Sequence, residues 1–221
     1  SGLPNTRVEA WKYTNLKPLA DSAPKPAAEA DVRAAVATDL LPAIDGVHRL
    51  VFVNGRHRPD LSDAGAPPDG VELTTVAGAL DKDAEALNGR LGAVARPNGH
   101  VLVNLNTAFL ADGAVLGIAP GAQVKRPVHL IFVATAGAEG TPAHHPRNLI
   151  VAGAGSRACV VESHIATADG IAYWSNPLAE ITVEEGARLD HVKVQADSRA
   201  ATHLSFAKAH VAAGGHYESF V

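Results

Sequence analysis

From about residue 99 onward, apolar and polar residues alternate in short runs that are separated by glycine-containing turns. Alternation of this kind is typical of β-strands, because successive side chains of a strand point to opposite faces. Residues 104–109 are the exception and look locally helical. The second half is therefore predicted to be a series of short strands joined by tight turns.

The first half mixes helical and strand patterns, and we expect an α/β region over residues 1–98. A short amphipathic helix over residues 30–41 is favoured by Val32, Val36 and Leu40, which recur at helical spacing. The other expected elements are an opening helix that Pro18 ends, a strand at 50–53 that turns at Asn54-Gly55 into a return arm at 56–58, a loop at 63–70, a strand at 71–76 and a helical stretch at 79–95.

Four glycines in the second half mark a repeat with a period of about 30 residues. An apolar or small residue stands three positions before each glycine, a small residue follows it, and an apolar residue stands three positions after it. A tight corner between two strands needs this pattern, because glycine relieves the backbone and the flanking side chains face one interior. The four glycines are Gly121, Gly155, Gly186 and Gly214.

A unit of strand, corner and strand cannot bury its apolar face alone, so it must stack on its neighbours. We therefore predict a parallel β-solenoid over residues 99–221. No six-residue rhythm is present, which argues against the left-handed β-helices of acyltransferases. A β-sandwich whose turns happen to contain Gly-Ala stays open as the alternative.

Composition narrows the class of protein further. The chain has 221 residues, of which 47% are hydrophobic, so a sizeable core can form. Nineteen Lys and Arg against 23 Asp and Glu give a net charge of −4, and no basic run suggests nucleic acid as a partner. No apolar stretch approaches the roughly 18 residues that span a bilayer, and no signal peptide is evident. We expect a cytoplasmic protein that does not contact membranes or nucleic acid.

The eleven histidines invite a metal-site hypothesis. His144 and His145 are adjacent, and His203, His210 and His216 follow one another at short intervals. Neither set has the His-x-His or His-x-x-x-His spacing of a metal template, so surface histidines are the expected reading and the metal ligands stay unknown.

No motif points to catalysis. The single cysteine, Cys159, has Arg157 as its nearest basic neighbour, which is weak support for an activated thiol, and we expect it to fill space. The glycines of residues 151–156 fit a corner better than a phosphate loop, and Glu184-Glu185 fits a solvated turn. We expect a protein that is not an enzyme, and we assign no catalytic or cofactor-binding residue.

Six segments, taken in order, resemble one known family. They are residues 2–14 (GLPNTRVEAWKYT), 50–55 (LVFVNG), 105–109 with 112–113 (LNTAF and DG), 126–130 (RPVHL), 145–148 (HPRN) and 186–191 (GARLDH). Any one could arise by chance, but their order and density are similar to the SufD branch of the SufB/SufD family. These proteins are scaffold subunits of the SUF iron-sulfur cluster assembly system.

The resemblance implies a helix-rich N-terminal region, a right-handed parallel β-helix and a C-terminal helical segment. It also implies a non-catalytic scaffold that pairs through its β-helix with the paralogue SufB and docks the SufC ATPase through C-terminal helices. An iron-sulfur cluster or iron would belong to the full complex, and we expect no cofactor on this chain alone.

Family members are about twice this length, so the sequence is expected to hold a truncated β-helix, with the distal rungs and the C-terminal helical domain beyond Val221. Unpaired groups on a final strand recruit other chains, so self-association through residues 216–221 is a further expectation. Two alternatives from other classes remain: a right-handed β-helix carbohydrate-active enzyme, and a metal-binding module that uses His144 and His145 or His203, His210 and His216.

Overall fold

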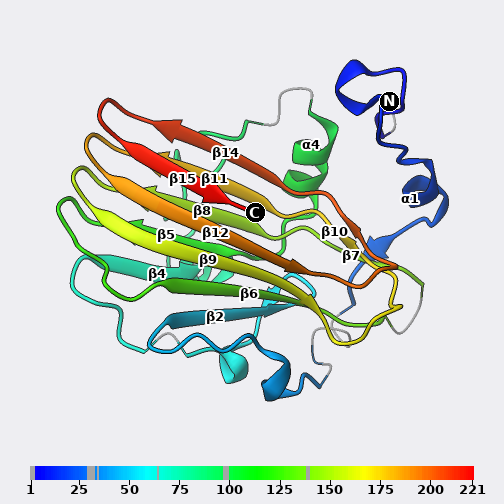
Figure 1. The fold of residues 1–221 in the computed structure, drawn as a ribbon, viewed down its shortest axis with the longest axis horizontal. Coiled ribbons are helices and arrows are strands. Elements are labelled where there is room, and N and C mark those ends of the chain that lie inside the picture. The colour runs from blue at the N-terminus through cyan, green and yellow to red at the C-terminus, as the bar shows by residue number, and fades with distance from the viewer. Residues whose placement is uncertain (1–2, 29–32, 34, 64, 97–99, 138–139) are drawn as a thin grey trace.

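The computed structural model describes residues 3–28, 33, 35–63, 65–96, 100–137 and 140–221. Figure 1 shows strands stacked one above another in successive coils, with α4 (Val101–Ala108) beside the upper strands. Within each coil the chain passes through three sheets in turn, and coils pair in parallel. The predicted parallel β-solenoid is thereby confirmed, and the sandwich alternative is wrong.

The three sheets are named A, B and C below. In spatial order, sheet A contains β1 (Lys25–Pro26), β7 (Pro142–His144), β10 (Trp174–Ser175) and β13 (Thr202–His203). Sheet B contains β15 (His216–Phe220), β12 (Arg188–Ala196), β9 (Arg157–Ala166), β6 (Val128–Ala134), β2 (His48–Val53) and β3 (Arg56–His57). Sheet C contains β14 (Phe206–Val211), β11 (Leu178–Val183), β8 (Arg147–Ala152), β5 (Ala114–Ile118) and β4 (Val71–Thr75).

The four glycine corners connect sheet C to sheet B, as the repeat predicts. All four glycines adopt φ between +64° and +74°, a region that side chains with a Cβ rarely enter. The corners also stack. The N–H groups of Gly121, Gly155 and Gly186 each donate to a carbonyl of the next corner, at 2.8, 2.8 and 3.3 Å. The flanking apolar residues join the main core between sheets B and C, apart from Val211, which is exposed.

The N-terminal strands belong to the same sheets. β2 pairs in parallel with β6, and β4 pairs antiparallel with β5, so sheets B and C continue across the expected boundary at residue 98. The boundary itself stays a prediction. The turn at Asn54-Gly55 joins β2 to β3 in an antiparallel hairpin, as expected.

Three helix predictions for the first half need correction. Pro18 does not end a helix but lies in the first turn of α1 (Lys17–Asp21), where its missing N–H costs nothing, and Trp11 ends a separate 3-10 turn, η1 (Glu9–Trp11). Of the helix expected over 30–41, residues 30–32 and 34 lie outside the described residues, and the remainder contains the 3-10 turn η2 (Thr38–Leu40). The stretch at 79–95 is helical within α3 (Val76–Lys82), and turns follow.

Irregular segments cover the outer faces of the sheets. Residues around η2 and η3 (Pro59–Leu61) pack on the outside of sheet B, where Leu41 and Leu61 contact Val51, Ile131 and other apolar side chains. α3 and the turns after it cover the outside of sheet C. In the described ranges, no helix is long and apolar enough to cross a membrane.

Gly155 and Gly113 are required for different reasons, and replacing each by alanine should distinguish backbone strain from a steric clash. A Cβ on Gly155 meets no atom within 4 Å, so Gly155→Ala costs only the positive-φ strain of about 1–2 kcal/mol. A Cβ on Gly113 would overlap the backbone carbonyl of Arg147 in the neighbouring strand. We expect Gly113→Ala to lower the free energy of unfolding clearly more than Gly155→Ala, as measured by urea denaturation. Equal losses would contradict this packing of coil on coil.

Candidate functional site

The interior of the solenoid changes from apolar to polar partway along its length. In β9, Ala158 and Val160 belong to the main core, and strand alternation carries Glu162 and His164 to the same inner face. The register places Glu162 beside Leu130. In the following coil, the residue opposite Glu162 is Lys193. Leu130, Glu162 and Lys193 thus occupy equivalent positions in three successive coils, so a column of stacked side chains changes from apolar to charged.

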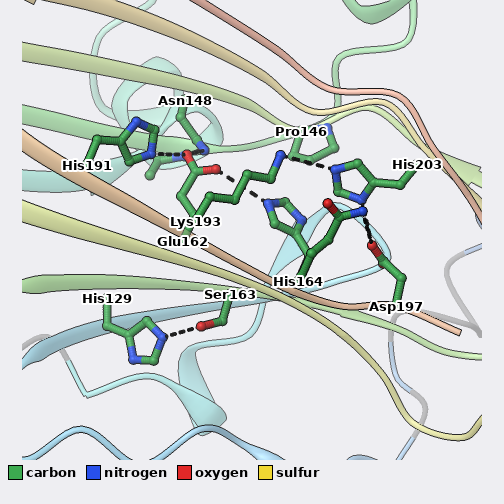
Figure 2. A network of polar contacts seen from close by, with 12 residues as sticks. His129, Pro146, Asn148, Glu162, Ser163, His164, His191, Lys193, Asp197 and His203 are labelled. Atoms are coloured by element: carbon green, nitrogen blue, oxygen red, sulfur yellow. Dashed lines mark hydrogen bonds and ion pairs between the residues drawn. The ribbon is translucent and has the colours of Figure 1, made fainter. Parts of the chain in front are cut away.

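Glu162 lies at the centre of this polar interior (Figure 2), and its side chain is 4% exposed. Asn148 Nδ2 donates to the Glu162 carboxylate across the interior at 2.9 Å. The Nε2 atoms of His164 and His191 each lie 3.4 Å from a carboxylate oxygen. Burial opposes ionisation of Glu162, but the contacts with these imidazoles prevail and hold its pKa well below the ordinary value.

His164 continues an aromatic column through the coils. Phe52 stacks on Phe132 at 5.1 Å between ring centroids, and Phe132 stacks on His164 at 4.9 Å. The edge of the next ring, His203, meets His164 at 4.7 Å. Burial lowers the pKa of His164 although Glu162 opposes the shift, so the ring packs as a neutral aromatic group in this column.

Asp197 is the second carboxylate of the network. The Tyr173 hydroxyl donates to it at 2.6 Å, Gln195 Nε2 donates at 2.9 Å, and His203 Nδ1 lies 2.9 Å away. Burial again opposes ionisation, but contacts with His203 and Tyr173 lower the pKa of Asp197 far below its ordinary value. Burial, followed by the bond to Asp197, raises the pKa of Tyr173.

Lys193 connects the two carboxylates. Its Nζ lies 3.1 Å from His203 Nε2. An ammonium group can only donate, so His203 Nε2 must accept and its proton sits on Nδ1, facing Asp197. Burial lowers the pKa of Lys193, against the attraction of Glu162 and Asp197. Lys193, His203 and Asp197 therefore lie in one row of polar contacts (Figure 2), and Glu162, opposite Lys193 in the register, attracts its ammonium group.

The adjacent histidines do not share a site. His144 stacks on Tyr173 at 5.7 Å, and burial with neighbouring imidazoles lowers its pKa to about 3. His145 instead meets the edge of the Trp174 ring at 5.0 Å, and burial lowers its pKa to about 4. Packing against aromatic rings is thus the observed environment of both side chains.

The other predicted histidine set is also dispersed. His203 is buried in the network, whereas His210 and His216 are exposed on β14 and β15. Within the ranges that the structure describes, no group of three or more His, Cys, Asp or Glu residues has the geometry of a metal site. The residues proposed for a histidine-based metal module are therefore not brought together.

Two further polar pairs lie outside the interior network. His129 Nε2 contacts Ser163 Oγ at 2.8 Å on the opposite face of sheet B, where both side chains are buried (Figure 2). Cys159 is partly exposed, and burial together with Asp190 raises its pKa. The cysteine is thus not an activated thiol, but its neighbourhood is less apolar than expected.

A buried ion pair fixes the outer cover of sheet C. The Arg147 guanidinium lies 2.6 Å from Glu180, and both side chains are at most 2% exposed. Glu180 also accepts the backbone N–H groups of Gly92, Val94 and Ala95 at 2.8–3.2 Å. Arg147 therefore joins the strands of the solenoid to the segment that precedes α4.

Sequence reasoning leaves most of this network out. It assigns no role to His164 or His191, and it passes over Glu162, Lys193, Asp197 and Tyr173. One signal was present: the alternation that puts Ala158 and Val160 inside also puts Glu162 inside. The partners of Glu162 come from other coils, and nothing local in the sequence predicts them.

These features define a class of protein: a parallel β-solenoid whose buried charges are satisfied largely by one another. Two family models match the chain, described as "SufBD protein N-terminal region" over residues 1–130 and "SUF system FeS cluster assembly, SufBD core domain" over residues 132–221. The chain belongs to the SufBD family.

Individual relatives agree with this assignment. The chain is 29% identical to an iron-sulfur cluster assembly SufBD family protein of Synechocystis, over 92% of this chain and 46% of that protein. It is 27% identical to the iron-sulfur cluster assembly protein SufD of Escherichia coli, over 93% and 45%, and 25% identical to the chloroplastic protein ABCI7 of Arabidopsis thaliana, over 68% and 32%. The chain spans about half the length of the first two curated relatives, and less of the third.

The lowered pKa values of the buried histidines predict that the protein loses stability in mild acid. The unfolded chain protonates His144 near the ordinary pKa of 6.5, whereas the folded chain does so only near pH 3. The contribution of His144 to stability is therefore fully present above about pH 6.5 and is lost as the pH drops toward 3, by about 2 kcal/mol at pH 5.

Urea denaturation at pH 7 and pH 5 tests this expectation. The His144→Gln variant should lose about 2 kcal/mol less stability between the two pH values than the parent chain does. His216→Gln, at an exposed position, is the matched control and should lose as much as the parent. Equal losses in the parent and in His144→Gln would contradict the burial of a neutral His144.

Proposed function

We propose that this protein is a non-catalytic scaffold subunit of iron-sulfur cluster assembly that works in the cytoplasm with SufB and the SufC ATPase. The observation that carries the proposal is the match of the two SufBD family models, which together cover residues 1–130 and 132–221. The names of the Synechocystis and Escherichia coli relatives, both iron-sulfur cluster assembly proteins, support the same process.

The side-chain chemistry supports a scaffold more than a catalyst. Glu162 and Glu180 are buried and Asp197 is partly buried, and each is already engaged by histidine, tyrosine, arginine or backbone donors. A general acid or base must reach its substrate. Glu180 and Asp197 face other parts of the chain, and Glu162, which lines a cavity of about 210 Å³, is held by Asn148, His164 and His191. The same point weakens the carbohydrate-active alternative, which needs accessible acids.

The partner-binding surfaces are part of the proposal. Relatives are about twice as long as the matched region, so we place the SufB and SufC surfaces mainly in the part of the family's length that this chain does not span. Iron or a cluster is the cargo of the complex in this proposal, and this chain holds no resident cofactor. The exposed strands β14 and β15 are where self-association would occur.

Affinity capture tests the scaffold assignment. The full-length gene product and residues 1–221 are each used as bait in an extract of the source cell, and bound proteins are identified by mass spectrometry. We expect the full-length product to retain SufB and SufC and residues 1–221 to retain neither, with near-ultraviolet circular dichroism confirming that both baits are folded.

Two outcomes would contradict parts of the proposal. Retention of SufB or SufC by residues 1–221 alone would move the interfaces into this part of the chain. Failure of the folded full-length product to retain either protein would overturn the scaffold function.

A further inference from the structure

A cavity of about 520 Å³ lies outside the solenoid interior, between the start of α4 and strands β11 and β14 of sheet C. Its apolar surface is formed by Val103 of α4, Leu178 of β11 and Phe206 of β14, together with Ala95. These side chains pack on one another, so the floor is a continuation of a small apolar cluster rather than a loose surface patch. The volume is within the range of roughly 300–1,000 Å³ that is typical of small-molecule sites.

The polar residues that line this cavity share one sign of charge. Arg96 and Lys208 lie at its edge, and no aspartate or glutamate is among the lining residues. In the described part of the chain, neither cation makes a hydrogen bond or ion pair. Other arginines behave differently: Arg58, Arg147 and Arg188 all pair with carboxylates. The cavity therefore combines an apolar floor with two exposed positive charges at its edge, and Glu180, the carboxylate opposite Lys208 in the register, is already bound by Arg147 and by backbone N–H groups.

His100 adds a third polar group to the same cavity. Its ring meets Phe206 edge-on at 4.3 Å, which fixes the imidazole against the apolar floor. Its Nδ1 atom is buried and has no hydrogen-bond partner among the described residues. His100 is also the N-cap of α4, and its side chain makes no cap bond to the helix, so the positive end of the helix dipole adds to the field of the two cations.

We propose that this cavity binds a small amphiphilic anion, with an aromatic or aliphatic body against Phe206, Leu178 and Val103 and an acidic group between Arg96 and Lys208. The acidic group pairs with Arg96 and Lys208, and the apolar body packs on the apolar floor. The proposal does not depend on the scaffold function, because the cavity does not use the interior network. Phe206 and Lys208 belong to β14, so self-association through that strand would compete with the anion.

Two fluorescent probes of similar shape test the role of charge. The anion 8-anilinonaphthalene-1-sulfonate carries a sulfonate, and N-phenyl-1-naphthylamine has the same ring system without it. Titrating the purified protein should give one saturable site that prefers the sulfonate. Because each substitution removes a charge-assisted contact with the sulfonate, Arg96→Gln and Lys208→Gln should each weaken sulfonate binding about tenfold and leave the neutral probe unchanged.

Matched control variants test whether any loss of a cation weakens binding, and an NMR experiment tests whether the probe binds in this cavity. Lys82→Gln and Lys125→Gln remove exposed cations away from the cavity and should leave both affinities unchanged. Methyl NMR spectra should show the largest probe-induced shifts at Val103 and Leu178. The proposal is overturned if the sulfonate binds Arg96→Gln and Lys208→Gln as tightly as the parent, if the controls weaken binding equally, if the shifts lie elsewhere, or if no saturable binding occurs.

Discussion

The structure depends on the parallel register of its coils. Because equivalent positions pair directly, each interior side chain lies against the corresponding side chain of the coil before it, and the interior consists of columns. A column can stay apolar at little cost, as Phe52 and Phe132 do. A column that becomes polar must find most of its hydrogen-bond partners inside the same solenoid, because its polar groups are largely buried even beside the cavity of about 210 Å³ that Glu162, His191 and Lys193 line.

The polar interior follows from that constraint. Glu162 replaces the leucine of the preceding coil, and Asn148, His164 and His191 from other positions surround it. Lys193 and His203 then extend the network to Asp197. Removing one member of such a network leaves a buried charge without its partner, which is generally far more costly than replacing the whole set by apolar residues. The network therefore commits these coils to one register and one set of protonation states.

The elements with local causes could be predicted from sequence. The corners are predictable because glycine adopts their positive φ angles at far lower cost than other residues. The Asn54-Gly55 pair predicts the hairpin for a similar reason. The helix expected at 79–95 failed because its second half is held by remote contacts. Backbone N–H groups of Gly92, Val94 and Ala95 bind the Glu180 carboxylate, more than 80 residues away. The partners of Glu162 were invisible for the same reason, since stacking coils, not neighbouring residues, assemble them.

Titration of the Glu162 carboxyl group tests the central claim most directly. In protein labelled with ¹³C at glutamate side-chain carboxyls, the Glu162 resonance is identified by its loss in Glu162→Gln and followed by NMR as the pH is lowered. The account predicts that Glu162 remains ionised well below its ordinary pKa of 4.5, for as long as the protein stays folded. Protonation of Glu162 at or above pH 4.5 in the folded protein would contradict the network of charges inside the solenoid.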